Sequence, residues 1–168
     1  MDQSQIYIGC PNGVVVCVDH YRAGGLSGVL YNQYQLEPSH FEDVSQMIMK
    51  MEAFYDEIRF PFSTRRPRSL LPDKIKKVKN ILNQNDHKKE ERVKVMKDGE
   101  FLQKHGDLGT FIVRVQNRQN SSWQGRVTWV EKNETVSFRS ALELLKLMEE
   151  VLVEEEEGET SHSFLDKK

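Results

Sequence analysis

Residues 109–138 read GTFIVRVQNRQNSSWQGRVTWVEKNETVSF, and this stretch decides the fold. Within it, 110–116 alternates β-forming and polar residues, which is typical of a strand with one buried face. The alternation returns over 125–131, so 117–124 is predicted to be the loop of a hairpin. A third short strand is expected at 135–138. The pattern therefore predicts an antiparallel sheet of three strands.

A helix is predicted directly after this sheet. Ser140 and Glu143 have the spacing of a capping box, in which the two side chains satisfy free amide groups at a helix start. The sequence then stays rich in leucine through Leu152, and its apolar face is broad enough to lie across the three strands. We therefore predict a β-β-β-α module over 108–153, followed over 154–168 by an acidic tail that should be disordered.

The N-terminal part predicts a hairpin followed by a helix. A β-branched run at 14–19 and a second apolar run at 28–34 are separated by polar residues and glycine, which favours an antiparallel hairpin. Ser39 and Glu42 have capping-box spacing, and apolar residues then recur every three or four positions, as on one face of a helix. This hairpin–helix unit is assigned to 1–60.

The composition of the 168-residue chain predicts a compact core with solvated polar segments, because 38% of its residues are hydrophobic and 30% are charged. The N-terminus lacks the features of a signal peptide, and no apolar run reaches the ~18–20 residues of a membrane-spanning helix. We expect a cytoplasmic α+β protein without membrane association. Cys10 and Cys17 are expected to be free thiols, and no internal repeat is apparent.

The segment between the two units is basic. We interpret 61–107 as a connector that is helical in part, with 86–107 as a flexible or irregular stretch. From Arg59 to Lys104 there are fourteen lysines and arginines against six acidic residues. Such an excess can neutralise the phosphates of RNA or DNA. Few aromatic residues are present to stack on bases, so a solvated linker is the competing interpretation.

Several strings resemble small, uncharacterised proteins of clostridial-type bacteria. In the C-terminal module these strings are RQNSSWQG at 118–125 and FRSALEL at 138–144. In the N-terminal half they are LSGVLYN at 26–32 and MEAFYDEIRFP at 51–61. The resemblance covers both ends of the chain without the lysine-rich middle. It implies a bacterial cytosolic origin and no particular activity.

The hairpin also contains a motif of a known nucleotide-binding family. Asn120, Ser122 and Gly125 fit the Asn-x-Ser-x-x-Gly pattern of PilZ domains, and this resemblance implies binding of cyclic di-GMP. The same three residue types are also the usual residues of tight turns, which is the simpler interpretation. In PilZ domains a companion motif supplies arginines, and the candidates in this chain are Arg65, Arg66 and Arg68, or Arg114 and Arg118.

We therefore predict a non-enzymatic binding or regulatory protein that acts through the 117–126 loop, on a protein partner or on a second copy of itself. Trp123 is expected to anchor this contact, with the alternative that its indole folds over the sheet edge. The predicted contact residues are Arg114, Arg118, Asn120, Ser122, Trp123, Gln124 and Gly125. A cyclic dinucleotide or a nucleic acid, bound with the help of Arg65, Arg66 and Arg68, is the second hypothesis.

Catalytic signals are weak, so no enzymatic activity, cofactor or metal is predicted. Cys17, Asp19 and His20 are close in sequence, but neighbouring residues of one strand point to opposite faces of the sheet. The other histidines are scattered. The sequence also lacks a phosphate-binding glycine loop, a nucleophile elbow and the spacing of metal ligands.

Overall fold

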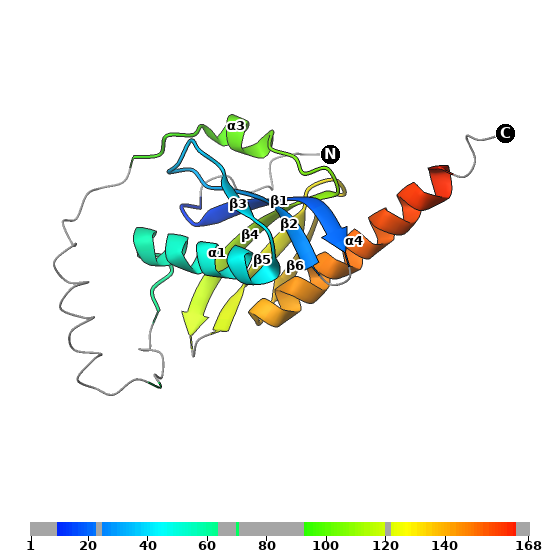
Figure 1. Cartoon of the computed structure of the whole chain (residues 1–168). Helices are drawn as coiled ribbons and strands as arrows, with labels where there is room; N and C mark the ends of the chain where they lie inside the picture. Colours follow the sequence, from blue (N-terminus) through cyan, green and yellow to red (C-terminus); the bar gives the residue numbers. More distant parts are fainter. Residues whose placement is uncertain (1–9, 23–24, 64–69, 71–92, 120–121, 164–168) are drawn as a thin grey trace.

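The computed structural model (Figure 1) describes residues 10–22, 25–63, 70, 93–119 and 122–163. The strands in this part of the chain are β1 (Gly13–Arg22), β2 (Gly25–Tyr31), β3 (Ser39–Phe41), β4 (Gly109–Gln119), β5 (Ser122–Trp129) and β6 (Glu134–Phe138). The helices are α1 (Val44–Ile58), α3 (Asp98–Leu102) and α4 (Ala141–Ser163). The α+β class expected from the sequence is confirmed.

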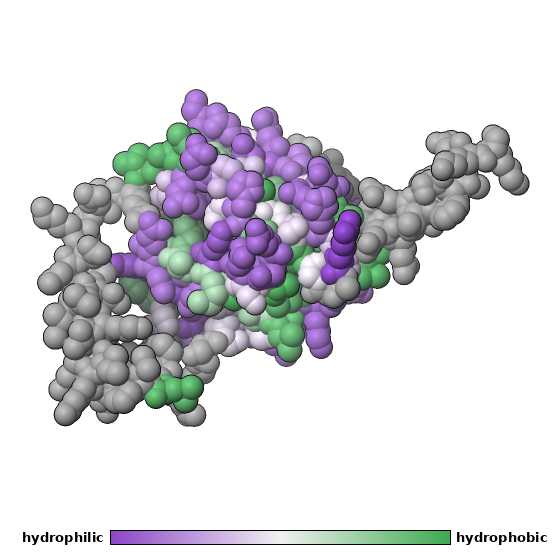
Figure 2. Space-filling view, viewed as in Figure 1, coloured by the Kyte–Doolittle hydropathy of each residue, from purple (hydrophilic) through white to green (hydrophobic). Residues whose placement is uncertain are grey.

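The strands form one antiparallel sheet in the order β3-β2-β1-β4-β5-β6, and α1 and α4 cover the same face of it (Figure 1). In β1, β2, β4 and β5 the residues that point to these helices alternate with those that point away, and most of them are buried there. On the other face, which we call the outer face, α3 and its neighbours cover part of β1 and β4. Hydrophilic residues make up much of the surface seen in Figure 2.

The two predicted units share this sheet, because β1 pairs with β4 along most of its length. Gly13 lies opposite Arg114 at one end of that pairing. A single cluster of buried apolar residues includes side chains from both halves and from both long helices. The hairpin–helix unit predicted at 1–60 and the module predicted at 108–153 therefore build one core.

The two halves of the sheet repeat one β-β-β-α unit with unchanged spacing. Adding 97 to a residue number in the first half gives its counterpart in the second: Gly28 pairs with Phe41, and Gly125 pairs with Phe138. The first strand of each half has a bulge at the same place, and α1 and α4 begin at matching positions. Since β1 and β4 are antiparallel neighbours, the halves are related by an approximate twofold axis between them.

The expectation that the chain has no internal repeat is therefore wrong at the level of structure. Only eight of the 46 residue pairs between 13–58 and 110–155 are identical, so the shared feature is the pattern of burial. Both halves have a glycine at this position, Gly28 and Gly125, because a Cβ at either position would collide with the carbonyl group of the adjacent strand. The identical pairs are Val16/Val113, Val18/Val115, Gly28/Gly125, Glu37/Glu134, Phe41/Phe138, Met51/Met148, Glu52/Glu149 and Glu57/Glu154.

The start of α1 differs from the prediction. Ser39–Phe41 forms β3 instead of the first helical turn, because it pairs with β2. The N-cap is Asp43, whose carboxylate accepts a hydrogen bond from the backbone N–H of Gln46 at 2.8 Å. The Gln46 side chain in turn accepts one from the backbone N–H of Glu42 at 3.3 Å. The capping box exists, but it lies four residues after the predicted one.

The capping box of α4 is confirmed. The backbone N–H of Glu143 donates to Ser140 Oγ at 3.0 Å, and the Glu143 carboxylate accepts from the backbone N–H of Arg139 at 2.6 Å. The helix continues to Ser163, although the acidic tail was predicted to be disordered. Glutamate is a good helix former, which explains the continuation. Over 155–163 only the helical backbone is described, and it extends past the sheet in Figure 1.

The remaining differences concern lengths. β4 and β5 meet across a shorter turn than expected, so most of the predicted 117–124 loop is strand. α3 lies within the 86–107 stretch that was expected to be flexible or irregular, and 86–92 falls outside the described residues. Within the described ranges, no helix is long and apolar enough to cross a membrane.

Candidate functional site

Arg118 is the centre of a buried cluster at the end of β4. Its side chain is 4% exposed, and its Nη1 lies 2.6 Å from Asp56 Oδ1 and 3.1 Å from Glu52 Oε1, both on α1. Its Nε donates a hydrogen bond to the backbone carbonyl of Pro61 at 2.9 Å. Hydrogen bonds between charged groups are among the stronger ones in proteins. Arg118 therefore fixes α1 and the turn after it onto the sheet.

Trp123 lies opposite Arg118 on β5 and belongs to the same cluster. Its indole Nε1 donates to Glu52 Oε2 at 2.7 Å, and its ring meets the ring of Tyr55 edge-on at a centroid distance of 5.5 Å. Burial raises the pKa of the Tyr55 hydroxyl, which has no hydrogen-bond partner among the described residues. Only 5% of Trp123 is exposed, so the alternative of an indole folded over the sheet is the one observed.

Neither Arg118 nor Trp123 is exposed to a partner, which corrects the expectation that both contact one. The first half contains an equivalent contact, in which Tyr21 Oη donates to Glu149 Oε1 at 2.7 Å. Tyr21 is the counterpart of Arg118, and its acceptor is the counterpart of Glu52. Each hairpin is thus bound to the helix of the other half. The cluster is therefore a structural feature that holds the two halves together.

The other residues of the predicted loop are divided by the pleat of β5. Gln124 is exposed on the outer face, whereas Gly125 is buried between β4 and β6. Ser122 Oγ makes a long hydrogen bond of 3.5 Å to the backbone carbonyl of Arg139. Asn120 lies outside the described residues. Two of the three motif residues are therefore on a strand, where they do not form one turn.

The basic group Arg65, Arg66 and Arg68 also lies outside the described residues. The chain just before it is described, and Ser63 forms a bridge with Arg118 at the end of β4. The chain thus enters the basic segment beside the hairpin that contains the predicted contact loop.

The outer face of the second half carries a pair of arginines. Arg114 on β4 lies directly opposite Arg126 on β5. Arg114 is half-buried and Arg126 is exposed, and neither side chain makes a hydrogen bond or ion pair with another described residue. Arg114 is among the contact residues predicted from the sequence, whereas Arg126 is not. The strand alternation and the register of the hairpin together place both on one face.

The electrostatics of the pair are unfavourable without a further group. Burial lowers the pKa of Arg114, the neighbouring Cys10 acts in the opposite direction, and the positive charge of Arg126 lowers this pKa further. Like charges directly opposite each other destabilise a strand pair. An arginine pair without a carboxylate is a candidate for a place where a bound anion supplies the missing charge.

Hydroxyl and amide groups surround the arginine pair. Ser137 lies opposite Arg126 on β6 and is exposed, and Gln124 is two residues away along β5. The hydroxyl groups of Thr128 and Thr135 lie 2.9 Å apart on the same face. The Thr128 and Thr135 hydroxyls are hydrogen-bonded to each other, whereas the Gln124 amide and the Ser137 hydroxyl can donate to an anion, so the surface has the chemistry of an anion site.

The first half has no such surface at the equivalent place. Cys17 is the counterpart of Arg114, and it is buried beneath α3 together with Met96 and Phe101. Val29 is the counterpart of Arg126. The outer face is therefore apolar and covered in one half, and basic in the other.

Cys17 has no sign of a catalytic role. Burial raises the pKa of its thiol to about 12, and the charges of Asp19 and Glu131 contribute to the increase, so the thiol is protonated at neutral pH. His20 is exposed on the same strand and makes no described contact with it. No group of three or more His, Cys, Asp or Glu in the described chain is placed to hold a metal ion.

Comparison with known proteins gives no match: no family model, no curated protein and no solved structure matches the chain. The resemblance to clostridial-type proteins and the PilZ-like motif therefore stay predictions.

Proposed function

We propose that this chain is a cytoplasmic, non-enzymatic binding protein that holds a phosphate group of its ligand between Arg114 and Arg126. One observation carries the proposal. The two arginines occupy directly opposite positions of β4 and β5 on the outer face, and among the described residues no carboxylate is paired with either side chain.

The energetics of the pair support an anionic ligand. Two arginines directly opposite each other reduce stability, and partial burial of Arg114 adds to this because a buried charge loses hydration. A bound phosphate converts the repulsion into two charge-assisted contacts, since each guanidinium presents a planar set of donors. The fold does not require the arginine pair, because the first half forms the same strand pairing with Cys17 and Val29 at the equivalent positions.

The neighbouring groups favour phosphate as the anion. Gln124 and Ser137 are exposed beside the pair and add an amide and a hydroxyl donor. A phosphate has several acceptor oxygens and can use all four side chains. A nucleotide phosphate fits this chemistry, so cyclic di-GMP is the first compound to try.

The test is calorimetric titration of the full chain with cyclic di-GMP, together with an NMR titration with inorganic phosphate. We expect Arg114→Gln and Arg126→Gln each to weaken binding about tenfold or more. Arg22→Gln is the matched control, because Arg22 is an exposed arginine at the far end of β1. The proposal is contradicted if both site variants bind the two compounds as the parent chain does.

A second candidate is a nucleotide or nucleic-acid site that uses Arg65, Arg66 and Arg68. The bridge between Ser63 and Arg118 supports it, since the basic segment starts beside the hairpin. In the same titrations, Arg65→Gln/Arg66→Gln would then abolish binding while Arg114→Gln would not. Loss of affinity at high salt is expected for this candidate.

A further inference from the structure

β6 is an edge strand without a cover. It pairs with β5 alone, and four of its five residues are exposed, including Val136 at 48%. Its sequence, ETVSF, has no proline and a single charge, and no other described segment hydrogen-bonds its backbone. An edge of this kind can pair with another extended chain.

A pocket of about 210 Å³ lies beside this edge, between α4 and the sheet. Its walls are apolar and include Trp129, Val136 and Leu147. Three carboxylates line it as well, those of Glu134, Glu150 and Glu154, and all three residues are exposed. We call this space the β6 pocket. It combines an apolar wall with an acidic rim.

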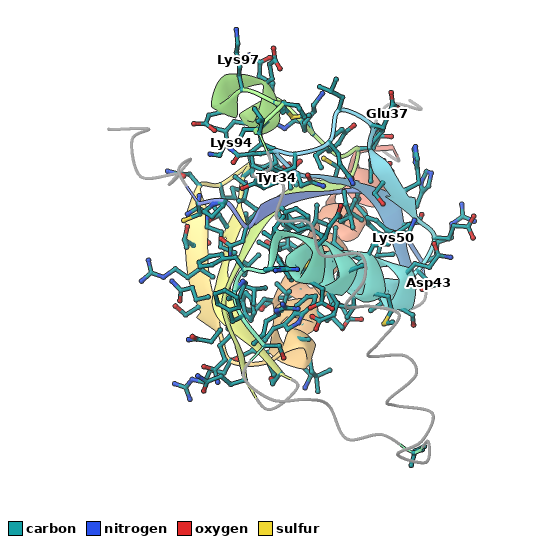
Figure 3. The ribbon with its side chains drawn as sticks, turned by 90° about the vertical axis from the view of Figure 1, so that its left-hand side faces the viewer. Tyr34, Glu37, Asp43, Lys50, Lys94 and Lys97 are labelled. Atoms are coloured by element: carbon teal, nitrogen blue, oxygen red, sulfur yellow. The ribbon has the colours of Figure 1, made fainter. Side chains whose placement is uncertain are left out.

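The first half has a pocket of the same size at the equivalent place, between α1 and β2–β3. There Lys50 of α1 lines the pocket, and its Nζ donates a hydrogen bond to the backbone carbonyl of His40 on β3. Figure 3 shows Lys50 on α1 and Asp43 at the start of this helix, with Glu37 in the segment before β3. Glu37 is the counterpart of Glu134. The chain therefore supplies its own lysine to this copy of the pocket and to its edge strand.

In the second half that lysine is missing, because the counterpart of Lys50 is Leu147. The acidic charge is increased instead, since Glu150 stands where the first half has Ala53. We propose that the β6 edge binds an extended segment of another protein, with a lysine side chain of that segment in the β6 pocket. This inference does not depend on the phosphate site.

The chemistry of the β6 pocket fits a lysine. The four methylene groups of the side chain can lie along the apolar wall while the ammonium group stays near the carboxylates at the rim. The chain's own Lys132 Nζ already lies 5.5 Å from the centre of the Trp129 ring, so the incoming ammonium group is assigned to the carboxylates and not to this ring. Main-chain pairing with β6 would supply the rest of the contact.

Charge argues against pairing of two copies of this chain through their β6 edges. Two copies paired through β6 would bring two acidic rims together, and like charges at an interface oppose association. A basic segment would instead be attracted by the acidic rim. The partner is therefore defined as an extended, lysine-bearing peptide.

The experiment uses the full chain and the labelled peptide Thr-Val-Thr-Lys-Thr-Val-Thr, with binding measured by fluorescence anisotropy. We expect this probe to bind at least about tenfold more tightly than the same peptide with glutamate at the centre. Methylation of alternate backbone nitrogens of the probe should abolish binding, because it removes the donors that pair with β6.

Variants test the same contact from the side of the protein. Glu150→Gln/Glu154→Gln should weaken binding of the lysine probe about tenfold. Glu42→Gln/Glu100→Gln, at exposed positions away from β6, is the matched control and should bind as the parent does. Equal binding of the lysine and glutamate probes overturns the proposal. So does a dimer in light scattering that Val136→Lys converts to a monomer, because the edge would then be occupied by a second copy.

Discussion

At one end of the sheet, Lys50 of α1 donates to the backbone of β3, whereas at the other end Leu147 takes the matching position and β6 is uncovered. β3 has three residues and follows Pro38, while β6 has five and no proline. Both ends rest on the same pairing of a glycine with a phenylalanine. The fold therefore forms with either a covered or an open edge strand. The requirements of folding alone do not explain why β6 is open.

The largest expected effect tests whether the two halves share one framework. Gly28→Ala and Gly125→Ala should each lower the free energy of unfolding by roughly 2–3 kcal/mol, because each new Cβ collides with a backbone carbonyl. Chemical denaturation measures this. Gly99→Ala on α3 is the control, since no atom lies within 4 Å of its Cβ position. If only one of the two variants loses much less stability than expected, Gly28 and Gly125 are not equivalent.

The next effect compares the two contacts between hairpin and helix. Arg118→Ala should cost about 2 kcal/mol, because it removes the buried partner of two carboxylates that are themselves partly exposed. Tyr21→Phe, at the equivalent position, should cost less than about 1 kcal/mol, since the hydrogen bond from its hydroxyl group to Glu149 is exposed. Equal losses in thermal denaturation would contradict this ranking.

Exchanging the residues that distinguish the two edges should exchange their behaviour. Leu147→Lys should reduce binding of the lysine peptide about tenfold, since the chain would then supply its own ammonium group to the β6 pocket. Lys50→Leu should leave the β6 edge unaffected in the same anisotropy assay. If Leu147→Lys binds the peptide unchanged, the contrast between the edges has no role in recognition.

The smallest effect concerns the outer face. Arg126→Thr should raise the free energy of unfolding by about 0.5 kcal/mol, because it removes a like charge opposite Arg114 and places a β-forming residue on β5. The same variant should weaken phosphate binding. Denaturation and titration of one sample measure both. A variant that is less stable than the parent would show that the arginine pair is not strained.

Local patterns allowed much of the second half to be predicted. The alternation of β4 and β5 and the capping box of α4 are short-range signals, and both are confirmed. β3 was predicted as helix because Phe41 fits the helical spacing as well as it fits a strand, and only its pairing with Gly28 decides between them.

Long-range partners explain the remaining differences at the candidate site. Trp123 is buried because Glu52, 71 residues earlier, accepts its N–H, and Arg118 meets Asp56 across 62 residues. No local pattern contains such a pairing. Arg126 was accessible to prediction, since the hairpin register that places it opposite Arg114 follows from the alternation of the two strands.

The approximate twofold axis between β1 and β4 has a consequence for how such a chain arises. A single β-β-β-α unit leaves its first strand unpaired on one side, and in this protein that side is closed by the other unit. Two identical units would close each other in the same way, as a homodimer. When two such units are fused into one polypeptide, their sequences can differ. One edge strand can then be covered by its own helix while the other edge strand stays open for binding.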